Sequence, residues 1–162
     1  MARRVFFSFH YKRDGWRVSQ VRNSWVTKPD REAAGYIDAA SWEQLERQGE
    51  EAIKRWINSQ LTGTSVTVVL IGAETAQRKW VQYEIIRSRD VDNNGLIGIY
   101  VNNILDQYRR RDSKGENPFD KLIDKKTGLP LSKLYSTYDW VNDNGYVNMG
   151  TWVERAAKQV GR

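Results

Sequence analysis

The sequence predicts an α/β fold with a central, mostly parallel sheet flanked by helices. Three short apolar runs, residues 4–9, 65–71 and 96–101, are nearly continuous and are typical of strands that are buried on both faces. Segments with apolar residues at helical spacing separate these runs. Strands that alternate with helices favour a parallel sheet whose crossover connections are right-handed.

The first predicted strand, residues 4–9 (RVFFSF), leads into a helix. Val18, Val21 and Trp25 recur at positions i, i+3 and i+7, which marks the buried face of that helix. Asp14 is placed to cap its start, because Asp is a preferred N-cap residue.

Residues 41–61 predict two further helical pieces. The stretch SWEQ at residues 41–44 matches a capping box, and apolar residues continue at helical spacing as far as Leu61. Gly49 interrupts this pattern. We therefore expect a short turn before Gly49 and a second helix after it, which ends at residues 62–63 (TG).

The strongest predicted strand is residues 65–71 (SVTVVLI), which is rich in β-branched residues. A helix over residues 78–89 follows, with Val81 and Ile85 facing the sheet. The turn NNG then leads into the strand at residues 96–101 (LIGIYV).

The pattern weakens towards the end of the chain. Residues 103–133 contain polar stretches with Gly and Pro and predict exposed loops. Residues 132–138 predict a late strand or an extended segment. A second capping box, TWVE at residues 151–154, predicts the start of a last helix. The length favours a single domain over residues 1–162.

Composition and charge restrict the classes of function. The formal charge of +6 favours anionic partners in general, although a solvated basic surface also explains it. The absence of cysteine excludes disulfides and thiolate metal ligands and fits a reducing cytoplasm. No apolar run reaches the roughly 18 residues of a membrane span. The opening MARRVFFSFHY is too short and too aromatic for a signal peptide, so we expect a cytoplasmic protein.

Several kinds of site are disfavoured. His10 is the only histidine, so a zinc site would need several carboxylates, and no metal is expected. A Ser-His-Asp triad would have to use His10, and no G-x-S-x-G elbow is present. The glycine fingerprints of common dehydrogenases and P-loop NTPases are also missing after the first strand. The basic residues at 109–111 and 125–126 lack interleaved aromatic side chains, so nucleic-acid binding is not expected.

The predicted architecture indicates where a ligand would bind. In open parallel sheets, ligands bind beyond the carboxyl ends of the strands, at the point where strand order reverses. This rule selects the segments that follow residues 9 and 71. In the first, Phe9 and Tyr11 could stack on a base, or could complete the core. His10 and Arg13 could contact sugar or phosphate, or could be ordinary structural and loop residues.

The stretch KWVQYEI (residues 79–85) keeps one carboxylate in a mostly apolar helical pattern. Trp80 and Glu84 are four residues apart, so a helix places them on one face. If Val81 and Ile85 pack on the sheet, that face lies at the edge of the core. A partly desolvated but reachable carboxylate there could stabilise positive charge that develops on a sugar ring. The W-x-x-x-E pattern is common by itself, and a carboxylate paired on a solvated face would explain it as well.

A series of sequence blocks resembles a known family. RVFFSFHY and WRVSQVRNSWVT near the start are followed by TSVTVVLIG, KWVQYEI, LIGIYVN, KGENPFD and YDWV in that order. Together they resemble the TIR-like family that includes ThsB of the bacterial Thoeris anti-phage system, over nearly the whole chain. The resemblance implies a flavodoxin-like, three-layer fold with a parallel sheet between two layers of helices.

The resemblance also implies an activity. Enzymatic members of the TIR family cleave nicotinamide from NAD, which is a substrate and not a cofactor, and then hydrolyse or cyclise the ADP-ribose part. Their catalytic glutamate matches Glu84 here, and the aromatic residue of their motif matches Trp80. Their nucleotide-holding loop matches residues 8–13, which adds Ser8 to the candidate binding residues named above.

Two other functions stay open beside an NAD-cleaving enzyme. Thoeris proteins of this type respond to phage with a cyclic ADP-ribose signal that activates a separate effector. A phage-derived trigger, an effector reached through a diffusible nucleotide and a homo-oligomer are therefore implied partners. The alternative is a non-enzymatic TIR-like module that works by self-association or partner binding. Nucleic-acid binding through the basic loops is the third hypothesis.

Overall fold

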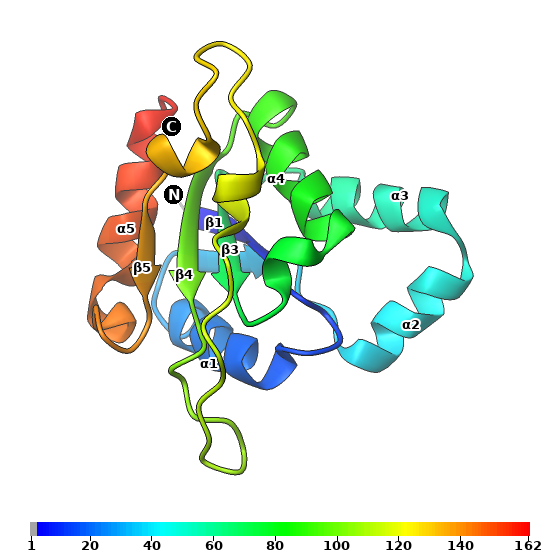
Figure 1. Ribbon diagram of the computed structural model, residues 1–162, viewed down its shortest axis with the longest axis vertical. Coiled ribbons are helices and arrows are strands. Elements are labelled where there is room, and N and C mark those ends of the chain that lie inside the picture. Colours follow the sequence, from blue (N-terminus) through cyan, green and yellow to red (C-terminus); the bar gives the residue numbers. More distant parts are fainter. Residues whose placement is uncertain (1–2) are drawn as a thin grey trace.

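A computed structural model describes residues 3–162 and contains a parallel sheet in the order β2-β1-β3-β4-β5 (Figure 1). The strands are β1 (Arg3–Ser8), β2 (Arg31–Ala34), β3 (Val66–Ile71), β4 (Gly95–Tyr100) and β5 (Thr137–Asp139). This is the flavodoxin-like strand order, and it confirms the predicted fold class.

Helices cover both faces of the sheet. They are α1 (Gly15–Val26), α2 (Ala39–Arg47), α3 (Glu50–Leu61), α4 (Lys79–Asp90) and α5 (Gly145–Gln159), with short 3-10 turns η1 (Thr75–Gln77), η2 (Pro118–Lys121) and η3 (Leu131–Lys133). Helices α1 and α5 contact each other, whereas α4 packs on β1, β3 and β4 from the other side (Figure 1). Among residues 3–162, no helix has the length and apolar character needed to cross a bilayer.

Strand β3 explains why the central apolar run is continuous. Val68 belongs to the larger buried cluster, which includes Val153 of α5. Val69 belongs to a second cluster, which includes Val81 and Ile85 of α4. Successive side chains of a strand point to opposite faces, so a strand between two helical layers is apolar at every position. Burial of each large aliphatic side chain contributes about 1.5–3 kcal/mol.

The three apolar strands predicted at residues 4–9, 65–71 and 96–101 and the helix after residue 77 are confirmed to within about two residues. The late strand predicted over residues 132–138 begins later, as β5 at residues 137–139, and β2 was missed. Only one of its four residues, Ala34, is buried, because β2 is the edge strand and pairs with β1 alone. So short a run carries too little apolar pattern to be distinguished from a loop.

Both capping boxes were wrong. Helix α2 begins earlier than the SWEQ box, because Asp38 is its N-cap and accepts a hydrogen bond from the backbone N–H of Ser41 at 2.8 Å. Helix α5 begins at Gly145, so Thr151 lies inside it. The residue before that helix, Asn144, is in the left-handed region at φ 51°. Helix α2 thus starts from a local cap upstream of the predicted box, and α5 starts from a left-handed turn at Asn144, so neither box marks the first turn of its helix.

Sheet topology brings the two predicted ligand-binding segments together. Strand β1 lies between β2 and β3, so strand order reverses at the β1–β3 boundary. Ser8 ends β1 and is in register with Val69 of β3. The loop after β1 and the connection from β3 to α4 therefore emerge side by side, at the place where such sheets bind ligands.

The turn after β2 supports a prediction on stability. Gly35 has φ +82°, and a Cβ atom there would lie 2.6 Å from the Phe7 carbonyl oxygen. Gly128 has φ +74° but nothing within 4 Å of an added Cβ. Both alanine variants incur the left-handed backbone cost of about 1–2 kcal/mol. In urea unfolding, Gly35→Ala should lose a further ~1–3 kcal/mol from the clash, and equal losses would contradict this packing.

Candidate functional site

The carboxylate of Glu84 lies inside the protein and faces β1. Its side chain has no solvent exposure. Ser8 Oγ at the end of β1 donates a hydrogen bond to Glu84 Oε1 at 2.7 Å, and the Tyr11 hydroxyl donates to Oε2. Two hydroxyl donors from the first strand and its loop therefore hold both carboxylate oxygens.

Aromatic packing fixes the Tyr11 hydroxyl in this position. The Tyr11 ring is 1% exposed, and its centroid lies 4.6 Å from that of Phe9 and 4.5 Å from that of Trp42 on α2. Trp56 on α3 approaches from the side at 5.8 Å. In this arrangement Tyr11 closes the carboxylate off from the α2–α3 side of the molecule.

Burial changes the ionisation of both partners. It raises the pKa of the Glu84 carboxyl to about 8, although the hydrogen bonds from Tyr11 and Ser8 and the charge of Arg78 lower it. The pKa of Tyr11 is also raised well above its ordinary value. Burial is the main cause, and the charge of the nearby Glu84 is the second. The sequence predicted a reachable, ionised carboxylate at the edge of the core. In the structure it is enclosed, and burial favours its protonated form.

Trp80 lies on the same helix as the buried carboxyl and lines an open cavity. The indole is 8% exposed and lies one helical turn before Glu84 on α4. It lines a cavity of about 440 Å³, here called the α4 cavity, between the α2–α3 turn and the start of α4. Lys79 Nζ lies 4.8 Å from the centroid of the indole ring. Glu84 does not line the α4 cavity in this arrangement.

The remaining predicted residues have different surroundings. Phe9 is fully buried and stacks on Tyr36 at 5.9 Å, so its ring completes the core and is not free to stack on a base. His10 is half-buried, and its pKa is lowered, mainly by burial and secondly by the charge of Arg78. Its Nδ1 atom has no hydrogen-bond partner within residues 3–162. Arg13 forms ion pairs with three carboxylates and none with Glu84.

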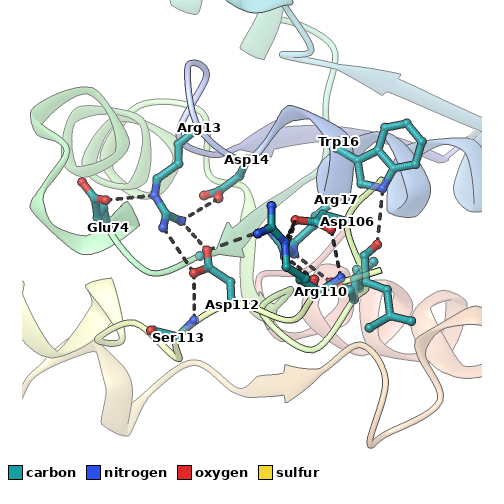
Figure 2. A network of polar contacts seen from close by, with 12 residues as sticks. Arg13, Asp14, Trp16, Arg17, Glu74, Asp106, Arg110, Asp112 and Ser113 are labelled. Carbon is teal, nitrogen blue, oxygen red and sulfur yellow. Dashed lines mark hydrogen bonds and ion pairs between the residues drawn. The ribbon is translucent and has the colours of Figure 1, made fainter. Parts of the chain in front are cut away.

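A network of ion pairs fastens residues 101–117, here called the edge segment, across the carboxyl ends of the strands (Figure 2). Arg13 pairs with Asp112 of the edge segment and with Glu74, which follows β3. Arg17 is 8% exposed, and its guanidinium donates to the backbone oxygens of Ile104 at 2.7 Å and Arg110 at 2.8 Å. The sequence pattern predicted only exposed loops here, because the ordering comes from contacts with α1 that are remote in sequence.

Asp14 joins the loops that follow β1 and β3. Its carboxyl is buried, accepts a 3.3 Å contact from Arg13 and lies 3.5 Å from Thr75 Oγ1. Burial raises its pKa to about 6, while Arg13 lowers it. Asp14 occupies the N-cap position of α1, as predicted, but among the described residues no hydrogen bond from the start of α1 reaches its side chain, so the carboxylate does not cap the helix. The carboxylate instead links the two loops.

Arg17 supports a prediction on the edge segment. Arg17→Gln removes the two charged donors to that segment, so local opening should become easier, and amide hydrogen exchange at residues 104–112 should accelerate about tenfold or more. Arg22→Gln on the same helix is the control, because Arg22 lies over the ring of Tyr36 instead. Exchange that is unchanged in Arg17→Gln would show that this residue does not hold the segment.

Sequence reasoning missed Arg78. It directly precedes α4, lines the α4 cavity and lowers the pKa values of Glu84, Tyr11 and His10 through its charge. The sequence did contain a signal, since a basic pair, residues 78–79, stands immediately before the W-x-x-x-E pattern. Only the structure shows that the charge of one of the two, Arg78, lies near enough to lower the pKa of the Glu84 carboxyl.

Known proteins resemble this chain in sequence. A model of "Thoeris protein ThsB, TIR-like domain" matches residues 6–106, a stretch that contains Ser8, Tyr11 and Glu84. A relative from Bacillus cereus (strain MSX-D12) is named "Putative cyclic ADP-D-ribose synthase ThsB1". It is 40% identical over an alignment of 192 residues, which covers 94% of this chain and 100% of the relative. The family match thus includes the buried glutamate and both of its hydroxyl partners.

Proposed function

Because this chain belongs to the TIR-like domain family of the Thoeris protein ThsB, we propose that it cleaves NAD and makes a cyclic ADP-ribose-type signal. The observation that carries the proposal is the Glu84 carboxyl, held by Ser8 and Tyr11 at the point where strand order reverses. The name of the Bacillus cereus relative, a cyclic ADP-D-ribose synthase, supports the same reaction class.

The proposed chemistry uses the negative charge of Glu84. Cleavage of the bond between ribose C1′ and the nicotinamide nitrogen leaves its electron pair on neutral nicotinamide and positive charge on the ribose. An ionised Glu84 would hydrogen-bond the ribose hydroxyls and stabilise that charge. A nucleophilic atom of the same ADP-ribose part then attacks C1′ and loses its proton, which closes the ring. Trp80 would cover the nucleotide and keep competing water away.

The described arrangement corresponds, in this proposal, to a closed resting form. Glu84 has no exposure, and its oxygens are already occupied by Ser8 and Tyr11. A ribose can replace these donors only if Tyr11 and its loop move, which would also let water reach the carboxyl and lower its pKa towards the ordinary range. A phage-derived trigger that displaces this loop would therefore activate the enzyme, and the diffusible product would reach a separate effector.

Mass spectrometry of small molecules tests the proposed function directly. Cells that express the chain should accumulate nicotinamide and a cyclic ADP-ribose-type nucleotide after phage challenge, whereas cells without the chain should not. If protected cells show no NAD-derived product, the enzymatic function is refuted, and a non-enzymatic interaction module becomes the better explanation.

A further inference from the structure

Arg78 is a cation without a partner at the mouth of the candidate site. Among residues 3–162, its side chain takes part in no hydrogen bond or ion pair, and its Nη2 atom is buried without a hydrogen-bond partner. Arginine keeps its charge at all physiological pH values. A buried guanidinium nitrogen with no acceptor is unfavourable, so such an atom calls for an explanation, and an anionic ligand would provide one.

The other charges of the α4 cavity are already neutralised. Glu46 pairs with Lys12 at 2.8 Å, and Glu50 pairs with Lys79. Arg78 is therefore the one charged side chain lining the α4 cavity that does not take part in these ion pairs. An anion that enters the α4 cavity would meet one available positive group and no unpaired carboxylate.

The start of α4 reinforces this preference. No side chain of the described residues caps the helix, and its first turn contains no acidic residue. The first amide groups of a helix lack partners within the helix and, with the helix dipole, favour negative charge. Arg78 and the first residues of α4, Lys79 and Trp80, line the same α4 cavity, so one anion there would lie near both the guanidinium and the start of the helix.

We propose that Arg78 binds the phosphates of the nucleotide substrate in the α4 cavity. This inference rests on the proposed function, and it assigns a phosphate subsite to a residue outside the W-x-x-x-E pattern. Arg78 precedes Glu84 by six residues, a rise of about 9 Å along a helix. A phosphate at Arg78 therefore leaves the attached ribose within reach of Glu84, in agreement with the order phosphate, ribose, nicotinamide in NAD.

Calorimetric titration of the purified full chain with inorganic pyrophosphate tests the subsite without the need for catalysis. The wild type should bind, and Arg78→Gln should bind at least about tenfold more weakly, because a charge-assisted bidentate contact is lost. Arg78→Lys should recover part of the affinity, since it restores the charge without the planar fork. Arg47→Gln is the matched control, because Arg47 is exposed on the neighbouring α2 and does not line the cavity.

Two results would overturn the subsite. One is a wild-type chain that does not bind pyrophosphate, and the other is equal affinity of Arg78→Gln and Arg47→Gln when both melt like the wild type. Glu84→Gln should bind pyrophosphate as the wild type does, because it leaves Arg78 in place. If pyrophosphate binding does not depend on Arg78 while cells still make the nucleotide product, the subsite alone is refuted. Arg78-dependent binding without any product would instead refute the enzymatic function alone.

Discussion

Replacing Glu84 with glutamine is expected to reduce the formation of nicotinamide and cyclic nucleotide in phage-challenged cells at least a hundredfold. The amide has nearly the same shape but cannot carry the negative charge that balances the developing positive charge on the ribose. Removal of a single electrostatic group of this kind commonly costs about 10²–10³ in rate. Ser8 and Tyr11 can keep hydrogen bonds to the amide, because hydroxyl groups both donate and accept. The loss should therefore not come from misfolding.

The comparison needs a control of the same chemical change. Glu43→Gln on the exposed surface of α2 removes one carboxylate that takes no part in the hydrogen bonds of Ser8 and Tyr11, and should leave product levels unchanged. Quantitative mass spectrometry of both variants at matched protein levels provides the measurement. Product that persists in Glu84→Gln would refute the catalytic role of this glutamate, even if the chain still cleaves NAD by other residues.

The same substitution is expected to stabilise the protein at alkaline pH. The pKa of the Glu84 carboxyl is 4.5 when unperturbed and about 8 in the folded protein, so the folded state holds this proton more tightly than the unfolded state. The contribution of this group to the free energy of unfolding is therefore greatest below pH ~4.5, and it falls as the pH rises towards 8. Glutamine does not titrate, so the stability of Glu84→Gln relative to the wild type should increase across this window.

Thermal melts between pH 4 and pH 9 would measure the effect. Each pKa unit corresponds to about 1.4 kcal/mol, so the relative gain should reach several kcal/mol, with a rise in Tm of about 2–4 °C per kcal/mol. Glu154→Gln is a control of opposite sign, because a hydrogen bond from Arg3 lowers the pKa of Glu154. That carboxylate supports folding above its unfolded pKa, so its removal should destabilise at neutral pH and not at acidic pH. A difference for Glu84→Gln that does not vary with pH would show that its carboxyl is not held protonated.

The parts of the fold that could be predicted are those whose pattern is local and strong. The run at residues 65–71 became β3 because a strand covered on both faces must be apolar at each position. The helix that carries Glu84 was predicted from the spacing of Val81 and Ile85, and both residues pack against the second buried cluster. Strand β2 was missed, since its place depends on pairing with β1 at the edge of the sheet.

The candidate site was predicted in outline only. Sheet topology and the resemblance together selected the loop after β1 and the W-x-x-x-E helix, and the structure joins them through Ser8, Tyr11 and Glu84. Neither periodicity nor spacing could show that Tyr11 would enclose the carboxylate, because the rings that hold Tyr11 come from α2 and α3. For the same reason Arg78 could not be recognised as unpaired until its surroundings were known.

Sequence patterns alone were enough to predict the class of fold, the helix on which the key carboxylate lies and the family to compare the chain with. These properties depend on apolar periodicity and on short ordered blocks, which are features of neighbouring residues. The folded arrangement was needed to show that Glu84 is enclosed and its pKa raised, that residues 101–117 are held over the strand ends, and that Arg78 lacks a partner. Solvent exposure, charge pairing and pKa depend on which segments, distant in the sequence, pack against each other. Those contacts are known only from the folded chain.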